Sequence, residues 1–327
     1  MTTHPLLRAA VWAAAVLLSL RAAAEERDER LATLEVGDVA ALASGPNELF
    51  IGTFDHGLVV VGVDGTRRPV RDTALNPHVN ALAYDSTRNT LWVATARGVT
   101  RCVTSTRWEC RRVGGPADVH AVIVLSDGSA VAGGEGGLQF LTQSGAERQV
   151  LDRKRGAPFR GVWALAQAGD GTLFVGSSNG LHWGSLQQFR ASGGSGSSAP
   201  SRLARAAVVT GQLADDWVTA LAISGDRVHV GTYNAGLASF IWRGGALQST
   251  SADPALGYIN PAGIRPLAGE RLAVCTMNGL LVGTPGAWRT VGTVRDVTSL
   301  AVESASPGSR AAYWIATRHG VERRVLD

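Results

Sequence analysis

Two histidines precede the glycine of a predicted turn, which raises the question of metal or acid–base chemistry. His56 is followed by Gly57, and His319 is followed by Gly320. Imidazole and carboxylate groups are suitable metal ligands, but a site needs three or four of them at about 2 Å from the ion. The candidates to complete such a set are Asp38, His78 and Asp296. The alternatives are contact with a ligand or partner, and plain solvent exposure of a polar turn residue.

Three aromatic residues begin consecutive apolar segments in the middle of the chain. Trp163 opens one such segment, Trp217 opens the next, and Tyr258 opens the one after. Three neighbouring aromatic rings would suit a carbohydrate ring or an aromatic side chain of a partner. The alternative is that these rings only pack between neighbouring elements.

A repeated pattern sets the elements that must position these residues. An apolar strand, a turn and a Gly-Leu or Gly-Val pair recur in segments such as 48–58 (ELFIGTFDHGL), 90–99 (TLWVATARGV) and 172–181 (TLFVGSSNGL). The glycines of the seven pairs are Gly57, Gly98, Gly137, Gly180, Gly236, Gly279 and Gly320. Their spacings are 41, 39, 43, 56, 43 and 41 residues, and the longest interval contains the Gly/Ser-rich segment 191–201. We expect that segment to be a flexible surface loop.

The repeat predicts an all-β fold. Each unit begins with a strand of small and β-branched residues, such as segments 78–84 (HVNALAY) and 217–223 (WVTALAI), and Asp-Gly turns mark hairpins. Four antiparallel strands in about forty residues make one blade of a β-propeller, so seven units predict a seven-bladed ring. The aromatic of the repeated strand (Phe50, Trp92, Phe174 and Trp314) is expected to fill the space between blades. Segment 30–36 is expected to complete the last blade and close the ring.

In such a ring, two sets of loops surround the mouth of the central channel. One set joins the second and third strands, and the other joins each blade to the next. Polar and aromatic residues in a concave funnel are the default binding site. The candidate ligand- or partner-binding residues are His56, His78, His120, Trp163, Trp217, Tyr258 and His319.

The N-terminus predicts export. Arg8 precedes an apolar run of twelve residues, and Ala22 to Ala24 provide small residues before Glu25. We expect residues 1–24 to be a signal peptide and residues 25–327 to form the propeller, in the periplasm or outside a bacterial cell. Cys102 and Cys110 lie on the two arms of a predicted hairpin, where an oxidising compartment permits a disulfide but direct cross-strand geometry is demanding. That pairing stays open.

Composition argues against several partners. The net charge is only +4, and no basic cluster is interleaved with aromatic residues, so we expect no nucleic-acid partner. We also expect a monomer with no transmembrane segment after removal of the signal peptide.

With the repeat in view, the chain resembles the two-component-regulator propeller family over residues 30–327. The shared pattern is a short V-x-A-L strand, a turn, and then L-W-[IV]-G-T-x-x-G-L. The resemblance implies a sensor-like propeller of the kind found in periplasmic parts of hybrid histidine kinases and in secreted proteins. The repeats at 129–138 and 271–280 lack the aromatic. No kinase or membrane span follows the propeller in this sequence, so we expect sensing to need a separate partner.

Three classes of function remain open. The first is a binding module or scaffold that recognises an envelope protein or a small ligand at the funnel. The second is a metal-assisted hydrolase or lyase with funnel His and Asp residues, and the third is a structural subunit that acts through its blade edges. Nucleophile, zinc-protease, phosphate-loop and haem-attachment motifs are absent from the sequence. We therefore favour the binding module and assign no cofactor, no metal ligand and no catalytic residue.

Overall fold

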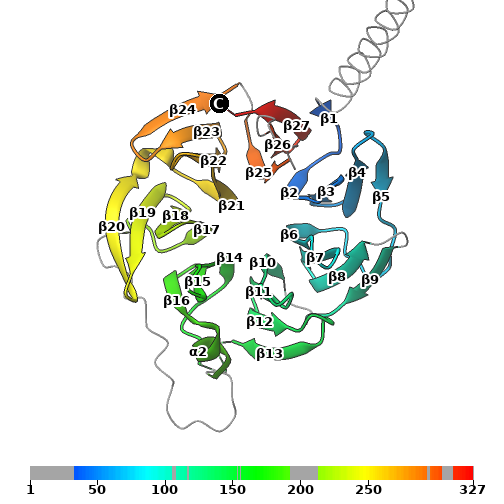
Figure 1. Ribbon diagram of the computed structural model, residues 1–327, viewed down its shortest axis with the longest axis horizontal. Coiled ribbons are helices and arrows are strands. Elements are labelled where there is room, and N and C mark those ends of the chain that lie inside the picture. Colours follow the sequence, from blue (N-terminus) through cyan, green and yellow to red (C-terminus); the bar gives the residue numbers. More distant parts are fainter. Residues whose placement is uncertain are drawn as a thin grey trace, which may run out of the picture.

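The computed structural model describes residues 33–104, 108–115, 118–152, 154, 156–191, 213–292, 295–303 and 312–326. In these residues the chain forms seven antiparallel sheets arranged around an axis (Figure 1), which confirms the predicted seven-bladed β-propeller. The predicted signal peptide, Arg30 to Ala32 and residues 192–201 of the predicted loop lie outside the described residues.

Each blade has its first strand next to the axis and its later strands further out (Figure 1). The inner strands are β2 (Val39–Ser44), β6 (Val79–Asp85), β10 (Val119–Val124), β14 (Val162–Gln167), β17 (Val218–Ser224), β21 (Ile259–Pro266) and β25 (Val297–Val302). The second strands are β3 (Glu48–Thr53), β7 (Thr90–Thr95), β11 (Ala130–Gly134), β15 (Thr172–Ser177), β18 (Arg227–Thr232), β22 (Leu272–Thr276) and β26 (Ala312–Thr317). The third strands are β4 (Leu58–Gly62), β8 (Gly98–Thr104), β12 (Gly137–Leu141), β16 (Gly180–Ser185), β19 (Leu237–Arg243), β23 (Gly279–Thr284) and β27 (Gly320–Val325).

The outermost elements differ between blades. The outer strands are β5 (Arg67–Pro69), β9 (Trp108–Arg112), β13 (Glu147–Leu151), β20 (Ala246–Asp253), β24 (Ala287–Val291) and, in the last blade, β1 (Thr33–Leu34). Strand β1 pairs antiparallel with β27, with Leu34 opposite Val321, so residues from the N-terminal side lie in the seventh sheet. A short 3-10 helix, η2 (Pro254–Leu256), follows β20.

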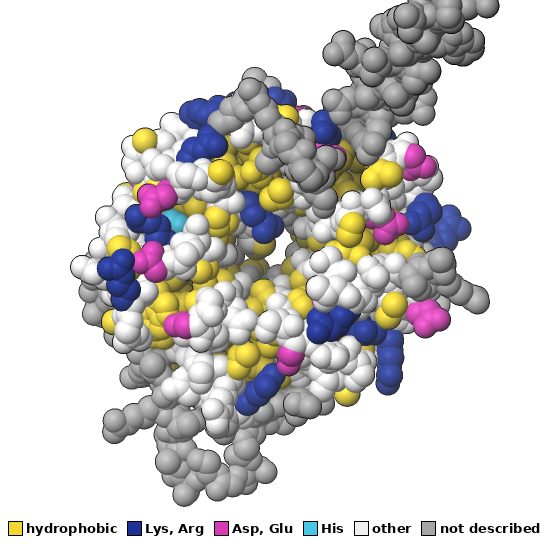
Figure 2. All heavy atoms as spheres, in the orientation of Figure 1, with side chains coloured by type: hydrophobic (Ala, Val, Ile, Leu, Met, Phe, Trp, Pro, Cys, Tyr) yellow, Lys and Arg dark blue, Asp and Glu magenta, His cyan; other side chains and the backbone are white. Residues whose placement is uncertain are grey.

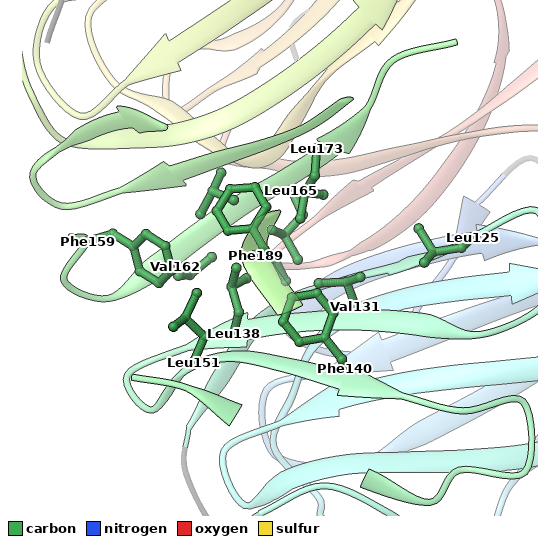
Figure 3. Packing of buried hydrophobic residues seen from close by; sticks show 12 residues of the cluster. Leu125, Val131, Leu138, Phe140, Leu151, Phe159, Val162, Leu165, Leu173 and Phe189 are labelled. Carbon is green, nitrogen blue, oxygen red and sulfur yellow. The ribbon is translucent and has the colours of Figure 1, made fainter. Parts of the chain in front are cut away.

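The fourth blade has three strands in the described residues, followed by the short helix α2 (Leu186–Ala191). Phe189 of this helix is fully buried beside Phe159 and Phe140 (Figure 3). The helix therefore packs its apolar side chain between blades three and four.

The core consists of seven hydrophobic clusters in the described residues, each shared by two adjacent blades. Phe50, Trp92 and Phe174 are fully buried in three of them, and Trp314 is 5% exposed in a fourth. The prediction that these aromatics fill the space between blades is confirmed. Because each cluster needs both blades, the ring is stabilised as a whole.

In four blades the next blade approaches so closely that one position of the second strand is glycine: Gly52, Gly133, Gly176 and Gly231. A Cβ at Gly176 would lie 2.5 Å from Val218 Cγ1 of the next blade, and one at Gly231 would lie 2.8 Å from Ile259 Cγ2. Glycine at this position allows the first residue of the next inner strand to pack directly on the sheet.

Candidate functional site

Every inner strand carries an irregularity near its start that sets the shape of the site. In each of the seven inner strands, the pairing with the second strand shifts register just after the first residue. Such a bulge leaves a residue outside the regular ladder and redirects its side chain. The residues next to the first one are Ala40, Asn80, His120, Trp163, Thr219, Asn260 and Thr298.

Six of these seven residues line a cavity of about 240 Å³ at the axis, which we call the mouth pocket. The remaining wall comes from the two loop sets that were predicted to surround the channel mouth. The full lining comprises Ala40, Phe54, Asn80, His120, Trp163, Tyr258, Asn260, Pro261, Met277, Asp296, Thr298 and Arg318. The pocket is thus built by bulged side chains within the ring and by loop residues around it.

Five aromatic rings form a continuous series along blades three to six, which we call the aromatic arc. His120 stacks on Trp163 with centroids 4.0 Å apart and ring planes 2° apart. Trp163 lies 5.5 Å from Trp217, which stacks on Tyr233 at 4.5 Å. Tyr233 meets Tyr258 edge to face at 5.1 Å. Pairs in these geometries each contribute about 0.5–1.5 kcal/mol beyond burial, so the arc is held in place before any ligand arrives.

The stacking also limits how the arc can meet a ligand. One face of Trp163 is covered by His120, and one face of Trp217 is covered by Tyr233. Among the rings of the arc, a ligand in the pocket therefore meets only the uncovered parts of His120, Trp163 and Tyr258, which line it.

Burial raises the pKa of Tyr258; the neighbouring Tyr233 acts in the same direction, and Arg318 opposes it. Tyr258 consequently keeps its phenolic proton at neutral pH and can donate a hydrogen bond into the pocket.

Phe54 and Arg318 form the opposite wall, at the junction of blades one and seven. The Arg318 guanidinium lies 5.9 Å from the centroid of the Phe54 ring, within the range of a cation–π contact. His78 meets the edge of Phe54 at 5.6 Å. The pocket therefore combines an aromatic wall with a positive charge held against a second aromatic ring.

Three of the bulged residues have a structural role between blades. Asn80 Nδ2 donates to the carbonyl of Val119 at 2.8 Å and to Asp118 Oδ1 at 2.8 Å. Thr219 Oγ1 donates to the Ile259 carbonyl at 2.6 Å, and Asn260 Nδ2 donates to the Val297 carbonyl at 2.5 Å. These bonds each join one blade to the first inner-strand residue of the next, and we call them inter-blade clasps.

Blade six departs from the others by a longer bulge. Four residues lie between its paired residues Ile259 and Ile264, where each of the other inner strands has a single unpaired residue, such as Ala40 between Val39 and Ala41. Pro261 lines the mouth pocket, and Ala262 has a left-handed backbone with φ of 54°. A Cβ at Gly263 would lie 2.5 Å from the Asn260 carbonyl oxygen, so the chain can fold back only with glycine there. Strained bulges of this kind recur beside binding sites.

The structure separates the predicted site residues into two groups. His120, Trp163 and Tyr258 line the mouth pocket, while His78 and Trp217 contact residues that line it. His56 and His319 are exposed and make no hydrogen bond or ring contact with each other; His56 Nδ1 lies 2.5 Å from Asp55 Oδ1.

His120 Nε2 lies 3.4 Å from Glu135 Oε1. The described residues contain no group of three or more His, Cys, Asp or Glu side chains that could hold a metal ion.

Several pocket residues escaped the sequence analysis. Phe54, Asn80, Met277 and Thr298 line the pocket, and Tyr233 belongs to the aromatic arc. Asn80 and Thr298 occupy the second position of their inner strands. The residue type at this position differs between blades, while the neighbouring positions stay small and apolar, and this contrast could have identified both residues.

Away from the pocket, Cys102 and Cys110 are joined by a disulfide between directly opposed residues of β8 and β9, with Cα atoms 4.1 Å apart. Cys275 is buried as a free thiol. Across the described ranges, no helix has the length and apolar character needed to span a bilayer.

Comparisons with known proteins show similarity of fold alone. No family model matches the sequence, and no curated protein matches it. PorZ, an essential surface component of the type-IX secretion system of Porphyromonas gingivalis, aligns over 90% of this chain with a TM-score of 0.60 and 16% identity. The extracellular domain of a putative one-component system from B. thetaiotaomicron aligns over 88% of this chain with a TM-score of 0.66 and 17% identity. The WD40 propeller domain of Doa1 aligns over 90% of this chain and 94% of its own length, with a TM-score of 0.65 and 13% identity.

The chain spans 38% of the length of PorZ and of the B. thetaiotaomicron protein. The neighbours therefore support the propeller fold, and they include extracellular domains of putative bacterial sensors. The resemblance to the two-component-regulator repeat stays a prediction at the level of sequence.

Proposed function

We propose that this chain is an exported binding module that takes a small ring-bearing ligand, or one aromatic side chain of a partner protein, in the mouth pocket. The aromatic arc is the observation that carries the proposal. Three of its rings, His120, Trp163 and Tyr258, line the mouth pocket, and none of its rings belongs to the hydrophobic clusters between blades.

The size of the pocket narrows the ligand class. Pockets for drug-sized molecules measure about 300–1,000 Å³, so about 240 Å³ suits one ring with its substituents. The ring would lie between the arc and Phe54, where Arg318 and the Tyr258 hydroxyl can bind its polar groups. Fold alone assigns no chemistry to a propeller, so the proposal rests on these side chains.

Export and sensing belong to the same proposal. The N-terminal segment has the composition of a signal peptide, and structural neighbours include extracellular domains of putative one-component and hybrid two-component systems. A module of this kind would report ligand occupancy to a separate envelope protein, which the rim around the pocket would contact.

Tryptophan fluorescence tests the proposal, since Trp163 lines the pocket and Trp217 contacts Trp163. The exported protein is titrated with p-cresol and, separately, with a methyl glycoside as ring probes. We expect saturable quenching by one probe class, and at least tenfold weaker binding in a Tyr258→Ala, Arg318→Ala double variant. Trp288→Ala, which removes a ring on outer strand β24, is the matched control and retains binding. Equal titration curves for all three proteins, or no saturation, would refute the mouth pocket as a ligand site.

A further inference from the structure

The inner strands place one residue each opposite the aromatic position of the second strand. Five blades have alanine there, one has isoleucine, and blade six has arginine: Ala43, Ala83, Ile123, Ala166, Ala222, Arg265 and Ala301. The residue opposite Arg265 is Ala273, where other blades have Phe50 or Trp92. In blade six the large side chain has therefore moved from the second strand to the strand beside the axis.

Arg265 borders the central channel, a cavity of about 550 Å³ enclosed by the inner strands. Figure 2 shows the ring open at its axis, with hydrophobic side chains around the opening. Among the described residues that line the channel, Arg265 is the only one with a permanent charge, and most of the others are Ala, Val, Leu or Ile. A charge in a narrow apolar channel acts over a longer range than one on an open surface.

The protein satisfies the Arg265 guanidinium only in part. One Nη donates to the Leu300 carbonyl of blade seven at 3.1 Å. The Nε atom is buried and has no hydrogen-bond partner among the described residues. A guanidinium has five N–H donors in a planar fork, so this one hydrogen bond leaves most of its donors without a partner among the described residues.

No carboxylate in the described part of the chain forms an ion pair with Arg265. Its polar neighbour is Cys275, and burial raises the pKa of this thiol to about 12, which leaves it neutral at physiological pH. Burial lowers the pKa of Arg265 itself, but arginine stays charged in proteins. A partly buried positive charge without a counter-charge is costly, and the cost is relieved when an anion binds.

A second polar atom of the channel also lacks a protein partner. Ser44 lines the channel, and its buried Oγ has no hydrogen-bond partner among the described residues. The neighbouring Ser299 Oγ accepts the backbone N–H of Leu42 at 3.2 Å and is therefore engaged. The channel wall thus holds one cation and one buried hydroxyl without a protein partner among mostly apolar residues.

We infer that the central channel is an anion site in which the Arg265 guanidinium binds a carboxylate-sized anionic group. The anion has two conceivable sources with the same chemistry. It is either a small free anion or the carboxylate tail of a ligand whose ring occupies the mouth pocket, because the two cavities adjoin and share lining residues such as Ala40, Asn80 and Trp163. The inference does not rest on the proposed function, since a free anion needs no part of the aromatic arc.

Crystals of the full chain soaked in sodium bromide test the site directly. We expect an anomalous difference peak within hydrogen-bonding distance of the Arg265 guanidinium. In solution, the unfolding midpoint is followed against sodium formate at constant ionic strength, balanced with gluconate. The wild type should show a saturable rise in midpoint, because a ligand that binds only the folded state stabilises it by mass action.

Variants separate the channel from general salt effects. Arg265→Ala introduces the residue that five other blades have at this position, and it should remove the saturable rise of the unfolding midpoint with formate. If the alanine variant folds poorly, Arg265→Gln replaces it in the same measurement. Arg243→Ala is the matched control, since Arg243 forms an exposed ion pair with Asp226. It should respond to formate like the wild type.

A pair of neutral and charged ligands separates the two sources. Phenylpropionate is compared with phenylpropanol in the wild type, in Arg265→Ala and in Tyr258→Ala. If the anion is free, the bromide peak and the formate-dependent rise in unfolding midpoint should be lost in Arg265→Ala and kept in Tyr258→Ala. A carboxylate-tail site gives phenylpropionate binding that needs both residues and exceeds phenylpropanol binding at least tenfold. The inference is wrong if no bromide peak lies at Arg265 and neither formate nor phenylpropionate depends on that residue.

Discussion

The imidazole Nδ1 of His229 lies 2.9 Å from the Ser239 hydroxyl, at a position where four other blades place a buried Phe or Trp between blades. His229 is buried, and this hydroxyl is its hydrogen-bond partner. Burial, with a smaller effect of Arg227, lowers the His229 pKa to about 4. The histidine is therefore neutral in the folded protein at physiological pH.

We predict that stability falls on acidification because of His229. The unfolded histidine titrates near 6.5, so between pH 6.5 and about 4 the unfolded state binds more protons than the folded state. The free energy of unfolding should decrease through this window by up to about 3 kcal/mol, and the contribution is fully present only above pH 6.5. Urea unfolding across the pH range measures the slope. His229→Phe should flatten it, and the exposed His56→Ala should not; an unchanged slope in His229→Phe would contradict the assignment.

The inter-blade clasps should stabilise the ring individually. Thr219→Val removes a donor to the buried Ile259 carbonyl without changing shape and should cost about 1–2 kcal/mol in the free energy of unfolding. Thr298→Val is the matched control at the same position of another blade, because the buried Thr298 Oγ1 has no partner in the described structure. We expect that control to be neutral or slightly stabilising. Equal losses for both variants would rule out the clasp as the cause.

Close approach of blades should make one glycine intolerant of a methyl group. Gly176→Ala would place its Cβ 2.5 Å from Val218 Cγ1 and should lower the free energy of unfolding by about 1–3 kcal/mol. Gly169→Ala is the control, since a Cβ there meets nothing within 4 Å. Chemical unfolding of the two variants side by side measures the difference, and a Gly176→Ala protein as stable as the control would exclude a steric role.

The Cys102–Cys110 disulfide should contribute modestly, because it closes a short loop. With a sequence separation of 8, chain entropy gives about 2–3 kcal/mol. We expect the Cys102→Ser, Cys110→Ser double variant to unfold at lower temperature than the wild type and to be indifferent to reductant. Reductant should lower the wild-type midpoint toward that of the variant. A wild type that ignores reductant under unfolding conditions would be inconsistent with this bond.

The architecture could be predicted because the residues that recur in each repeat are those whose side chains pack between blades. Phe50 and Trp92 marked the second strands, and their burial follows from the seven-fold pattern. In blade six the packing could not be predicted. Ala273 signalled only a missing aromatic, and the compensating Arg265 lies on a different strand, so only the strand register relates the two.

Only part of the mouth pocket could be predicted from the sequence. Trp163 and Tyr258 were found because they begin inner strands near the channel mouth. Asn80 and Thr298 were missed because strict alternation assigns alternate residues to opposite faces of a blade, whereas a bulge turns one of them toward the axis. Tyr233 was missed because a single aromatic in a loop carries no periodic signal.

The bulge at the start of every inner strand has a consequence for how this ring can change over time. Six of the seven blades present one side chain to the mouth pocket from a position outside the regular ladder, so most replacements there leave strand pairing and inter-blade packing intact. The exceptions are the three positions that also act as clasps. Ala40, His120, Trp163 and Thr298 are consequently free to diverge one at a time. Selection can therefore retune what the ring recognises by single substitutions, without first having to repair its fold.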